Sequence, residues 1–221
     1  KTRIHPVNSW FILGLNQVHK GHTIQDSNEI KSNAFLESLV DEDKQLVKQF
    51  ITYHKKNGGV SRFKKFEYFF KKIKNQKKYA NSLDNALNRY AKLSYEGLLN
   101  STEVKGVRRI LMFLHDLNIE SFVVSGGEQN ELRAVLKNKH LDQYFKKIFG
   151  SPTTKEEHLQ AIRPTKSLYF GDAESDYIAA SNFDMDFVFI SGVSDWEDGV
   201  DFCKFNNIEI LKDFSDLELS W

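Results

Sequence analysis

Polar residues that could carry chemistry occur at a few points of this sequence, most of them just after an apolar run. In chain order they are His19 and His22, Ser125 and Gly126, Lys155, and Asp172 and Asp176. Imidazole, hydroxyl, ammonium and backbone N–H groups can bind an oxyanion, and carboxylates can hold a divalent cation. Simpler interpretations also exist, because serine can end a strand and aspartate favours turns and helix caps.

The elements around these residues alternate between strands and helices after about Thr102. Apolar runs predict strands at 10–18, 121–124, 167–170, 186–190 and 208–211, and helical spacing predicts helices at 104–117, at 128–137 and from about 175. This alternation is typical of a Rossmann-like α/β fold, in which a parallel sheet is covered by helices on both faces. Ligands of such sheets bind at the carboxyl ends of the strands, so we expect the residues that follow the strands to lie at one edge.

Residues 27–97 separate the first strand from the other strands, and they show helical spacing. Asn57-Gly58-Gly59 interrupts the helical pattern, and Ser61 is typical of a residue that caps the next helix. We therefore predict an inserted all-helical cap at 27–97. Residues 1–26 and 98–221 would then form the α/β core.

The predicted cap carries a strongly basic segment. Between Lys44 and Lys78 there are twelve Lys or Arg and a single acid, Glu67, whereas the whole chain has a net charge of only +1. A basic unit in an acidic remainder could attract phosphorylated ligands, nucleic acid or an acidic partner. It could equally be a solvated helical face.

The composition limits the class of protein. A hydrophobic fraction of 40%, with 18 Phe, is enough for a sizeable and largely aromatic core. The single cysteine, Cys203, excludes an intrachain disulfide and is typical of a reducing compartment. The apolar run from Trp10 to Leu15 is too short to span a bilayer, and no signal-peptide cleavage pattern follows it. We expect a cytoplasmic protein without a membrane segment.

Three segments together resemble the motifs of a known family. Phe122–Gly127, Gly150–Lys155 and Tyr169–Asp176 are similar, in this order, to the second, third and fourth motifs of the haloacid dehalogenase (HAD) superfamily of phosphohydrolases. In that family the second motif ends in Ser or Thr, the third supplies a lysine, and the acidic residues of the fourth hold magnesium. The predicted helical insertion resembles the family's cap, so the resemblance covers most of the chain.

The resemblance implies a first motif with two aspartates, and this chain lacks both. In the family, an aspartate at the end of the first strand attacks phosphorus, and a second one, two residues later, protonates the leaving group. The pair Asp26-Ser27 resembles the start of the family's cap, which lies about seven residues after the nucleophile. Counting back from this pair puts His19 at the nucleophile position and Gly21 at the acid position. An alternative alignment puts Gly14 and Asn16 at these two positions. No aspartate precedes Asp26, so the absence does not depend on the alignment.

This departure predicts a pseudophosphatase, because loss of a covalent nucleophile typically lowers the rate by about 10⁴- to 10⁶-fold. We expect the phosphate site to be formed by His19, His22, Ser125, Gly126 and Lys155. Asp172 and Asp176 would hold Mg²⁺ in a weakened site, since one carboxylate ligand is lost. A phosphorylated small molecule is the expected ligand. A sugar phosphate comes first, because the second and third motifs resemble those of HAD proteins of sugar-phosphate and surface-polysaccharide metabolism.

Other functions stay open at this stage. The chain could be an active HAD-type phosphohydrolase of unusual mechanism, with His19 as a phosphohistidine nucleophile as one chemical route. His19-Lys20-Gly21-His22 also matches the His-x-Gly-His motif of nucleotidyltransferases, although their second, basic signature near the C-terminus is not evident. A third option is an interaction module that binds an acidic partner through the basic cap. Nucleic acid is not expected as a partner.

Overall fold

The computed structural model describes residues 10–14, 26–57 and 60–217. Within them, six strands form one parallel sheet in the order β3-β2-β1-β4-β5-β6. The strands are β1 (Trp10–Leu13), β2 (Glu120–Glu128), β3 (Lys147–Ser151), β4 (Ser167–Gly171), β5 (Asp186–Ile190) and β6 (Glu209–Leu211). The sequence analysis did not predict β3, because its Lys-Ile-Phe-Gly-Ser run has only two large apolar residues.

Helices cover both faces of the sheet, as the sequence predicts. They are α5 (Val107–Asp116), α6 (Gln129–Asn138), α7 (Lys155–Ile162), α8 (Glu174–Ser181) and α9 (Gly199–Phe205), with the short 3₁₀ turns η2 (Asp142–Tyr144), η3 (Ser191–Val193) and η4 (Phe214–Asp216). Successive strand residues point to opposite faces. Leu13 accordingly packs in one core cluster with α5 and α6, and Ile12 packs in another with residues of α7 and α8.

The second group of helices lies between β1 and α5 in the chain. It comprises α1 (Asp26–Ser38), α2 (Lys44–Lys56), α3 (Arg62–Tyr68), the π-helix η1 (Phe69–Ile73) and α4 (Ala80–Leu99). Asp43 and Ser61 accept hydrogen bonds from the first backbone N–H groups of α2 and α3, so both helices begin at side-chain caps. The inserted all-helical cap is therefore confirmed.

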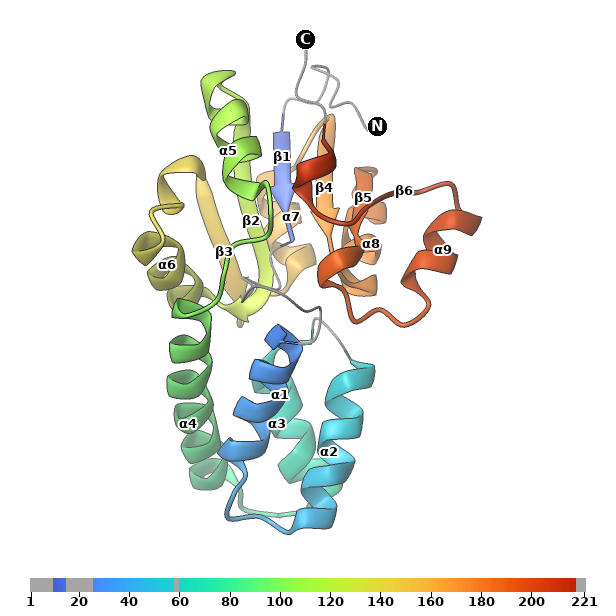
Figure 1. The fold of residues 1–221 in the computed structure, drawn as a ribbon. Coiled ribbons are helices and arrows are strands. Elements are labelled where there is room, and N and C mark those ends of the chain that lie inside the picture. The colour runs from blue at the N-terminus through green and yellow to red at the C-terminus, as the bar shows by residue number, and fades with distance from the viewer. Residues whose placement is uncertain (1–9, 15–25, 58–59, 218–221) are drawn as a thin grey trace.

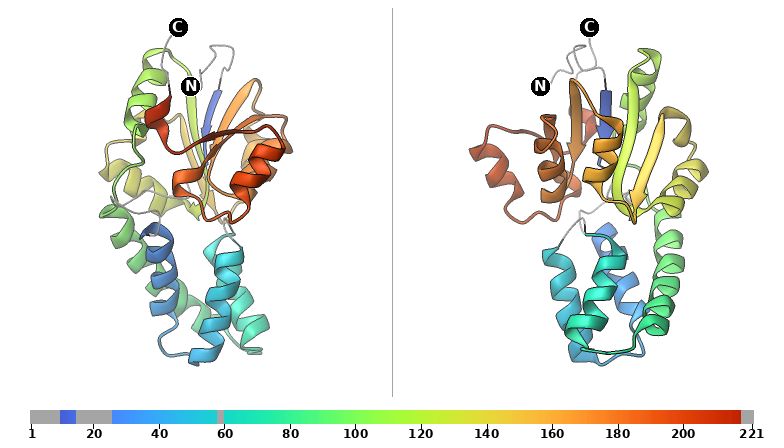
Figure 2. Two further views of the ribbon diagram at one scale, coloured as in Figure 1. Left: turned by 45° about the vertical axis from the view of Figure 1, so that its right-hand side comes forward. Right: turned by 180° about the vertical axis from the view of Figure 1, so that it is seen from behind.

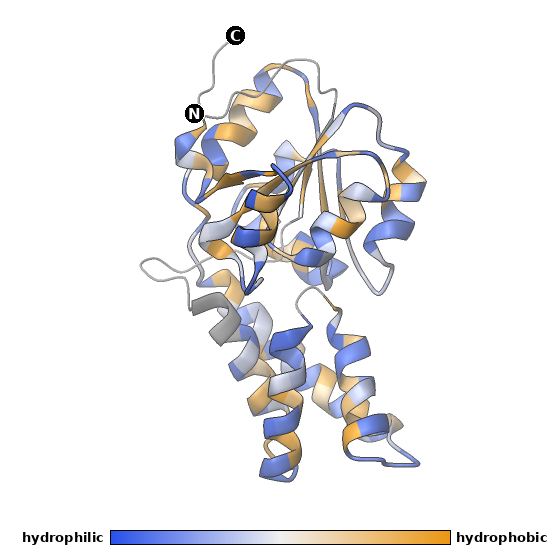
Figure 3. Cartoon of the chain, turned by 90° about the vertical axis from the view of Figure 1, so that its right-hand side faces the viewer, coloured by the Kyte–Doolittle hydropathy of each residue, from blue (hydrophilic) through white to orange (hydrophobic). Residues whose placement is uncertain are grey.

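The cap has a core of its own that consists mainly of aromatic rings. Phe35, Phe50, Phe66 and Phe69 are each at most 2% exposed, and Tyr90 closes the cluster. The ring centroids of Phe35 and Phe66 lie 5.0 Å apart, and those of Phe35 and Tyr90 lie 4.3 Å apart. In the hydropathy view, the cap helices carry both hydrophilic and hydrophobic colours, as expected for helices that bury one face each (Figure 3).

The cap stands at the carboxyl edge of the sheet. The arrow of β1 points toward the cap helices, and both further views keep the cap at this end (Figures 1 and 2). The chain runs from β1 outward to β2 and β3 and then returns to the other side of β1 at β4, so the strand order reverses between β1 and β4. Ligands of doubly wound sheets bind at such a switch point.

Among the described residues, we find no helix that is both long and apolar enough to cross a lipid bilayer.

Candidate functional site

The carboxylate of Asp176, which is 0% exposed in α8, is the centre of the polar cluster at the switch point. Its Oδ1 accepts hydrogen bonds from Lys155 Nζ at 2.6 Å and from the Tyr169 hydroxyl at 2.9 Å. Its Oδ2 accepts from the backbone N–H groups of Asp172 at 3.3 Å and Ala173 at 3.2 Å. Four donors satisfy the hydrogen-bonding capacity of one ionised carboxylate almost completely.

Lys155 is placed by the start of α7, where Thr154 and Glu157 form a capping box. The side chain of Lys155 is only 6% exposed, and its ammonium also donates to Ser175 Oγ at 3.0 Å. The structure thus brings together Lys155 and Asp176, which the sequence analysis had assigned to separate phosphate and metal roles. Here they are partners in a buried ion pair.

Gly14 directly follows β1, and its backbone N–H donates to the carbonyl of Phe170 at 2.7 Å. A Cβ atom on Gly14 would lie 2.6 Å from Asp176 Oδ1 and 2.7 Å from Tyr169 Cε1. Both distances are shorter than van der Waals contact, so the site has no room for a side chain at this position. Of the two alignments of the first motif, the one with Gly14 places the nucleophile position directly after β1.

Ser125 is 1% exposed near the end of β2, and its Oγ accepts a hydrogen bond from the Gly127 backbone at 3.0 Å. The carbonyl of the preceding Val124 accepts from the Tyr169 hydroxyl at 3.3 Å. Ser125 therefore lies beside the Tyr169–Asp176 contact, as expected for a residue at the carboxyl edge. Gly126 is half-buried in the same strand.

Asp172 follows β4 and is 6% exposed, and its carbonyl accepts a hydrogen bond from the Ser194 hydroxyl. The Ser194 hydroxyl oxygen also accepts from the Trp196 backbone N–H at 3.0 Å. The first bond holds the loop after η3, which includes Asp195, against the end of β4, and the second lies within that loop. His19 and His22 lie outside the described residues, so their predicted role is untested.

The cap contributes a buried basic group that the sequence analysis did not identify. Lys65 of α3 is 3% exposed, and its ammonium donates to His54 Nδ1 at 2.8 Å and to the His54 carbonyl at 3.3 Å. Burial, and then the charge of Lys31, lowers the pKa of Lys65 to about 7, while Asp195 acts in the opposite direction. Burial, followed by the charge of Lys65, lowers the pKa of His54 to about 2. His54 is therefore a neutral acceptor for Lys65.

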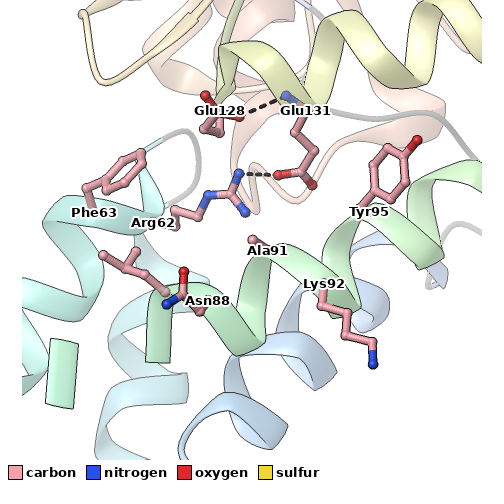
Figure 4. A pocket seen from close by; sticks show the side chains of 9 residues that line it. Arg62, Phe63, Asn88, Ala91, Lys92, Tyr95, Glu128 and Glu131 are labelled. Atoms are coloured by element: carbon pink, nitrogen blue, oxygen red, sulfur yellow. Dashed lines mark hydrogen bonds and ion pairs between the residues drawn. The ribbon is translucent and has the colours of Figure 1, made fainter. Parts of the chain in front are cut away.

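A second feature is a cavity of about 510 Å³ at the junction of cap and core (Figure 4). Its lining residues are Arg62, Phe63, Leu87, Asn88, Ala91, Lys92, Tyr95, Glu128 and Glu131. Arg62 Nη2 donates to Glu131 Oε2, and both side chains are at least nine-tenths buried. Because Ser94 donates to the other oxygen of Glu131 at 2.6 Å, this carboxylate joins two cap helices to α6.

The carboxylate of Asp176 does not offer the free oxygens that the magnesium site implied by the HAD resemblance needs. Mg²⁺ needs oxygen ligands in near-octahedral geometry. Both oxygens of Asp176 already have two donors each, and a lysine ammonium contacts one of them. Within the described ranges, no group of three or more Asp, Glu, His or Cys side chains could hold a metal ion.

Comparison with known proteins gives one family. The family description "Haloacid dehalogenase-like hydrolase" matches residues 22–190, which is more than half of the chain. The match begins after β1, so the segment with the altered first motif lies outside it. A comparison with curated proteins gives no match.

Solved structures with the same fold include several phosphatases. A β-phosphoglucomutase from Clostridium difficile has a TM-score of 0.68 at 15% identity, covering 96% of this chain and 93% of the other. A predicted phosphatase from Clostridium acetobutylicum has a TM-score of 0.65 at 17% identity, covering 91% and 92%. A HAD-hydrolase from Bacillus subtilis, solved bound to magnesium, has a TM-score of 0.57 at 14% identity, covering 82% and 88%.

Proposed function

Because the chain belongs to the haloacid dehalogenase-like hydrolases, we propose that it is a pseudophosphatase of this family, which binds a phosphorylated small molecule without forming a phosphoaspartate. The observation that carries the proposal is the contact geometry at Gly14. A side chain there would collide with Asp176 Oδ1 at 2.6 Å. The sequence has no aspartate before Asp26, and the space that a side chain would need directly after β1 is filled.

The state of Asp176 supports the same proposal. In a metal-dependent phosphatase this carboxylate would have to turn its oxygens to the cation. Here Lys155 and Tyr169 hold Oδ1, and backbone N–H groups hold Oδ2. Removing one partner from a buried ion pair leaves the other charge without compensation, which is unfavourable by about 3–5 kcal/mol.

Glucose phosphates are the first ligands to test. A structural neighbour is named as a β-phosphoglucomutase, and the fold it shares with this chain extends over 96% of the residues. The carboxyl edge of the sheet also offers the hydroxyl of Ser125 and backbone N–H groups, which are suitable donors to a phosphate.

The experiment has a turnover arm and a binding arm. Turnover of p-nitrophenyl phosphate and of glucose 1- and 6-phosphate is measured with millimolar Mg²⁺, beside a Lys155→Met variant that reports activity from contaminants. We expect the same residual rate for both proteins, and binding of a glucose phosphate by isothermal titration without Mg²⁺. Magnesium-dependent turnover that disappears in Lys155→Met would refute the proposal.

A further inference from the structure

The cavity of about 510 Å³ at the junction of cap and core begins at the end of β2 (Figure 4). Its lining includes Glu128, the last residue of β2, and Ser125 precedes Glu128 by three residues in the same strand. Three residues of fully extended chain span at most about 10 Å. A hexose phosphate has a similar length, so a ligand whose phosphate group lies at Ser125 can reach this cavity with its ring.

Arg62 presents an unused hydrogen-bond donor to the cavity. Its side chain is 7% exposed, and Nη2 donates to Glu131 Oε2. Within the described ranges, Nη1 is buried and has no hydrogen-bond partner. In Figure 4, a dashed line joins one terminal nitrogen of Arg62 to Glu131, whereas the other terminal nitrogen has none. A buried donor without a partner is unfavourable, so an acceptor oxygen of a ligand is stabilising at this position.

The charge of Arg62 is already compensated within the protein. Glu131, whose side chain is 9% exposed, pairs with Arg62, and its other oxygen accepts from the Ser94 hydroxyl at 2.6 Å. The carboxylate of Glu128 accepts from two backbone N–H groups at the start of α6, at 3.0 and 2.8 Å. With the exposed Lys92, two cations and two carboxylates line the cavity, so its formal charge is zero.

This balance favours an uncharged group in the cavity. An anion would lie beside the carboxylates of Glu128 and Glu131. If the anion displaced Glu131 from Arg62, a buried carboxylate would lose its counter-ion, which is strongly unfavourable. A hydroxyl or ether oxygen, in contrast, accepts a hydrogen bond from Arg62 Nη1 and leaves the ion pair intact.

The other lining residues suit the carbon skeleton of such a ligand. Phe63, Leu87, Ala91 and Tyr95 are half-buried and contribute apolar surface from α3 and α4. The exposed amide of Asn88 adds both a donor and an acceptor. Apolar walls with a few polar groups are typical of sites for small molecules. A sugar ring has apolar C–H faces and hydroxyl groups at its edge, so it matches both kinds of surface.

We propose that this cavity binds the uncharged, hydroxyl-bearing ring of the phosphorylated ligand, and that Glu131 determines the specificity by neutralising Arg62. The inference rests on the proposed function and names its ligand class, a monophosphate of a neutral sugar rather than a compound with a second anionic group. The phosphate group of this ligand lies near Ser125 at the carboxyl edge of the sheet. Its ring lies at the junction of α3, α4 and α6, where Arg62 Nη1 donates to one of its oxygens.

The test is isothermal titration of the full chain, without Mg²⁺, with three probes: inorganic phosphate, glucose 1-phosphate and glucuronic acid 1-phosphate. The two sugar phosphates differ only at C6, which carries a hydroxyl group in the first and is a carboxylate in the second. We expect glucose 1-phosphate to bind about tenfold more tightly, or better, than each of the other two probes.

Two variants and a control test the named residues. Glu131→Gln removes the charge that compensates Arg62 but keeps an acceptor oxygen, so the preference for glucose 1-phosphate over glucuronic acid 1-phosphate should fall to about twofold or less. Ala91→Phe fills the cavity without changing the ion pair, so it should weaken glucose 1-phosphate binding about tenfold and leave inorganic phosphate within about twofold. The control Glu120→Gln removes a more exposed carboxylate, paired with Lys146 at the opposite end of β2, and should bind like the unmodified chain.

The outcomes separate this inference from the proposed function. Equal affinities for inorganic phosphate and glucose 1-phosphate would mean that only water enters the cavity, which overturns the inference and leaves the proposed function intact. Glucuronic acid 1-phosphate that binds as tightly as glucose 1-phosphate has the same consequence, and so does glucose 1-phosphate binding that Ala91→Phe leaves unchanged. Absence of binding of all three probes overturns both. If Glu131→Gln does not fold, Ala91→Phe still decides, because Ala91 is not part of the ion pair.

Discussion

The ammonium of Lys155 lies 2.6 Å from Asp176 Oδ1, and the two side chains are 6% and 0% exposed. This contact makes the lysine the counter-ion of the carboxylate, so the pair is electrically neutral without a metal. Removing one partner of a buried pair typically destabilises a protein by about 3–5 kcal/mol, whereas replacing both by apolar residues is often neutral. The pair therefore has a structural role that can be measured separately from any ligand.

Asp176→Asn should lower the free energy of unfolding by about 3–5 kcal/mol, because it leaves the ammonium of Lys155 buried without its counter-ion. The double variant Lys155→Met/Asp176→Leu should recover only part of the loss, because it removes both charges but also removes the acceptor of the Tyr169 hydroxyl and of two backbone N–H groups. Urea unfolding followed by circular dichroism measures both. A loss below about 1 kcal/mol for Asp176→Asn would show that the pair is open in solution.

Magnesium should not stabilise the protein. A ligand present at 100 times its dissociation constant adds about 2.7 kcal/mol to the free energy of unfolding, which thermal denaturation detects easily. Since the oxygens of Asp176 are occupied by four donors, we expect the same unfolding temperature in MgCl₂ and in NaCl of equal ionic strength. A rise that is specific to MgCl₂ contradicts the assignment of Lys155 as the counter-ion.

Gly14→Ala should destabilise the fold by about 1–3 kcal/mol, because the new methyl group overpacks the space between Asp176 and Tyr169. Tyr169→Leu removes the ring edge that lies 2.7 Å from that methyl position, so the two substitutions should be less destabilising together than their sum. Denaturant unfolding of the four proteins of this double-mutant cycle gives the coupling energy. Additive effects would mean that the ring of Tyr169 does not limit the space at Gly14.

Much of the fold follows from local patterns in the sequence. The runs at 121–124, 167–170 and 186–190 lie within β2, β4 and β5, because a strand that is buried on both faces must be apolar throughout. The strand β3 was not predicted, since its five residues include a lysine, a glycine and a serine. The edge position of β3 in the sheet tolerates this composition.

The contacts within the site were harder to predict from the sequence than the fold. The positions of Lys155 and Asp176 were predictable, but their ion pair was not, because it depends on how α7 and α8 pack. Tyr169 was placed in an apolar strand and in the segment that resembles the fourth motif, but no hydrogen bond was predicted for it, although a phenol in a fully buried strand needs a hydrogen-bond partner. Lys65 was counted only as one of the basic residues between Lys44 and Lys78, since charge counting gives no information on which lysine points inward.

The ion pair of Arg62 with Glu131 should contribute far more to stability than the pair of Arg89 with Asp41. The first joins cap and core with side chains 7% and 9% exposed, whereas the second has side chains 46% and 71% exposed. We expect about 3–5 kcal/mol of destabilisation for Arg62→Ala and about 0–1 kcal/mol for the matched control Arg89→Ala. Equal effects in urea unfolding would mean that the contact between cap and core is not maintained in solution.

The stability of the protein should rise between pH 7 and pH 10 through Lys65. Burial, and then the charge of Lys31, lowers the pKa of this lysine from 10.5 to about 7. In that window the unfolded chain binds the proton and the folded protein does not, so the free energy of unfolding rises with pH, by at most about 1.4 kcal/mol per unit for one group. Below about pH 7 both states are protonated, and the contribution of Lys65 no longer changes.

The comparison of the unmodified chain with Lys65→Met isolates this contribution. His54, whose pKa is lowered from 6.5 to about 2, does not titrate above pH 7, and the lowered pKa of Lys31 acts in both proteins. Urea unfolding at pH 7, 8 and 9 should therefore give a steeper rise for the unmodified chain and for a Lys64→Met control, an exposed neighbour on the same helix, than for Lys65→Met. Parallel pH profiles for all three proteins would place the ammonium of Lys65 in contact with water and remove the reason for its lowered pKa.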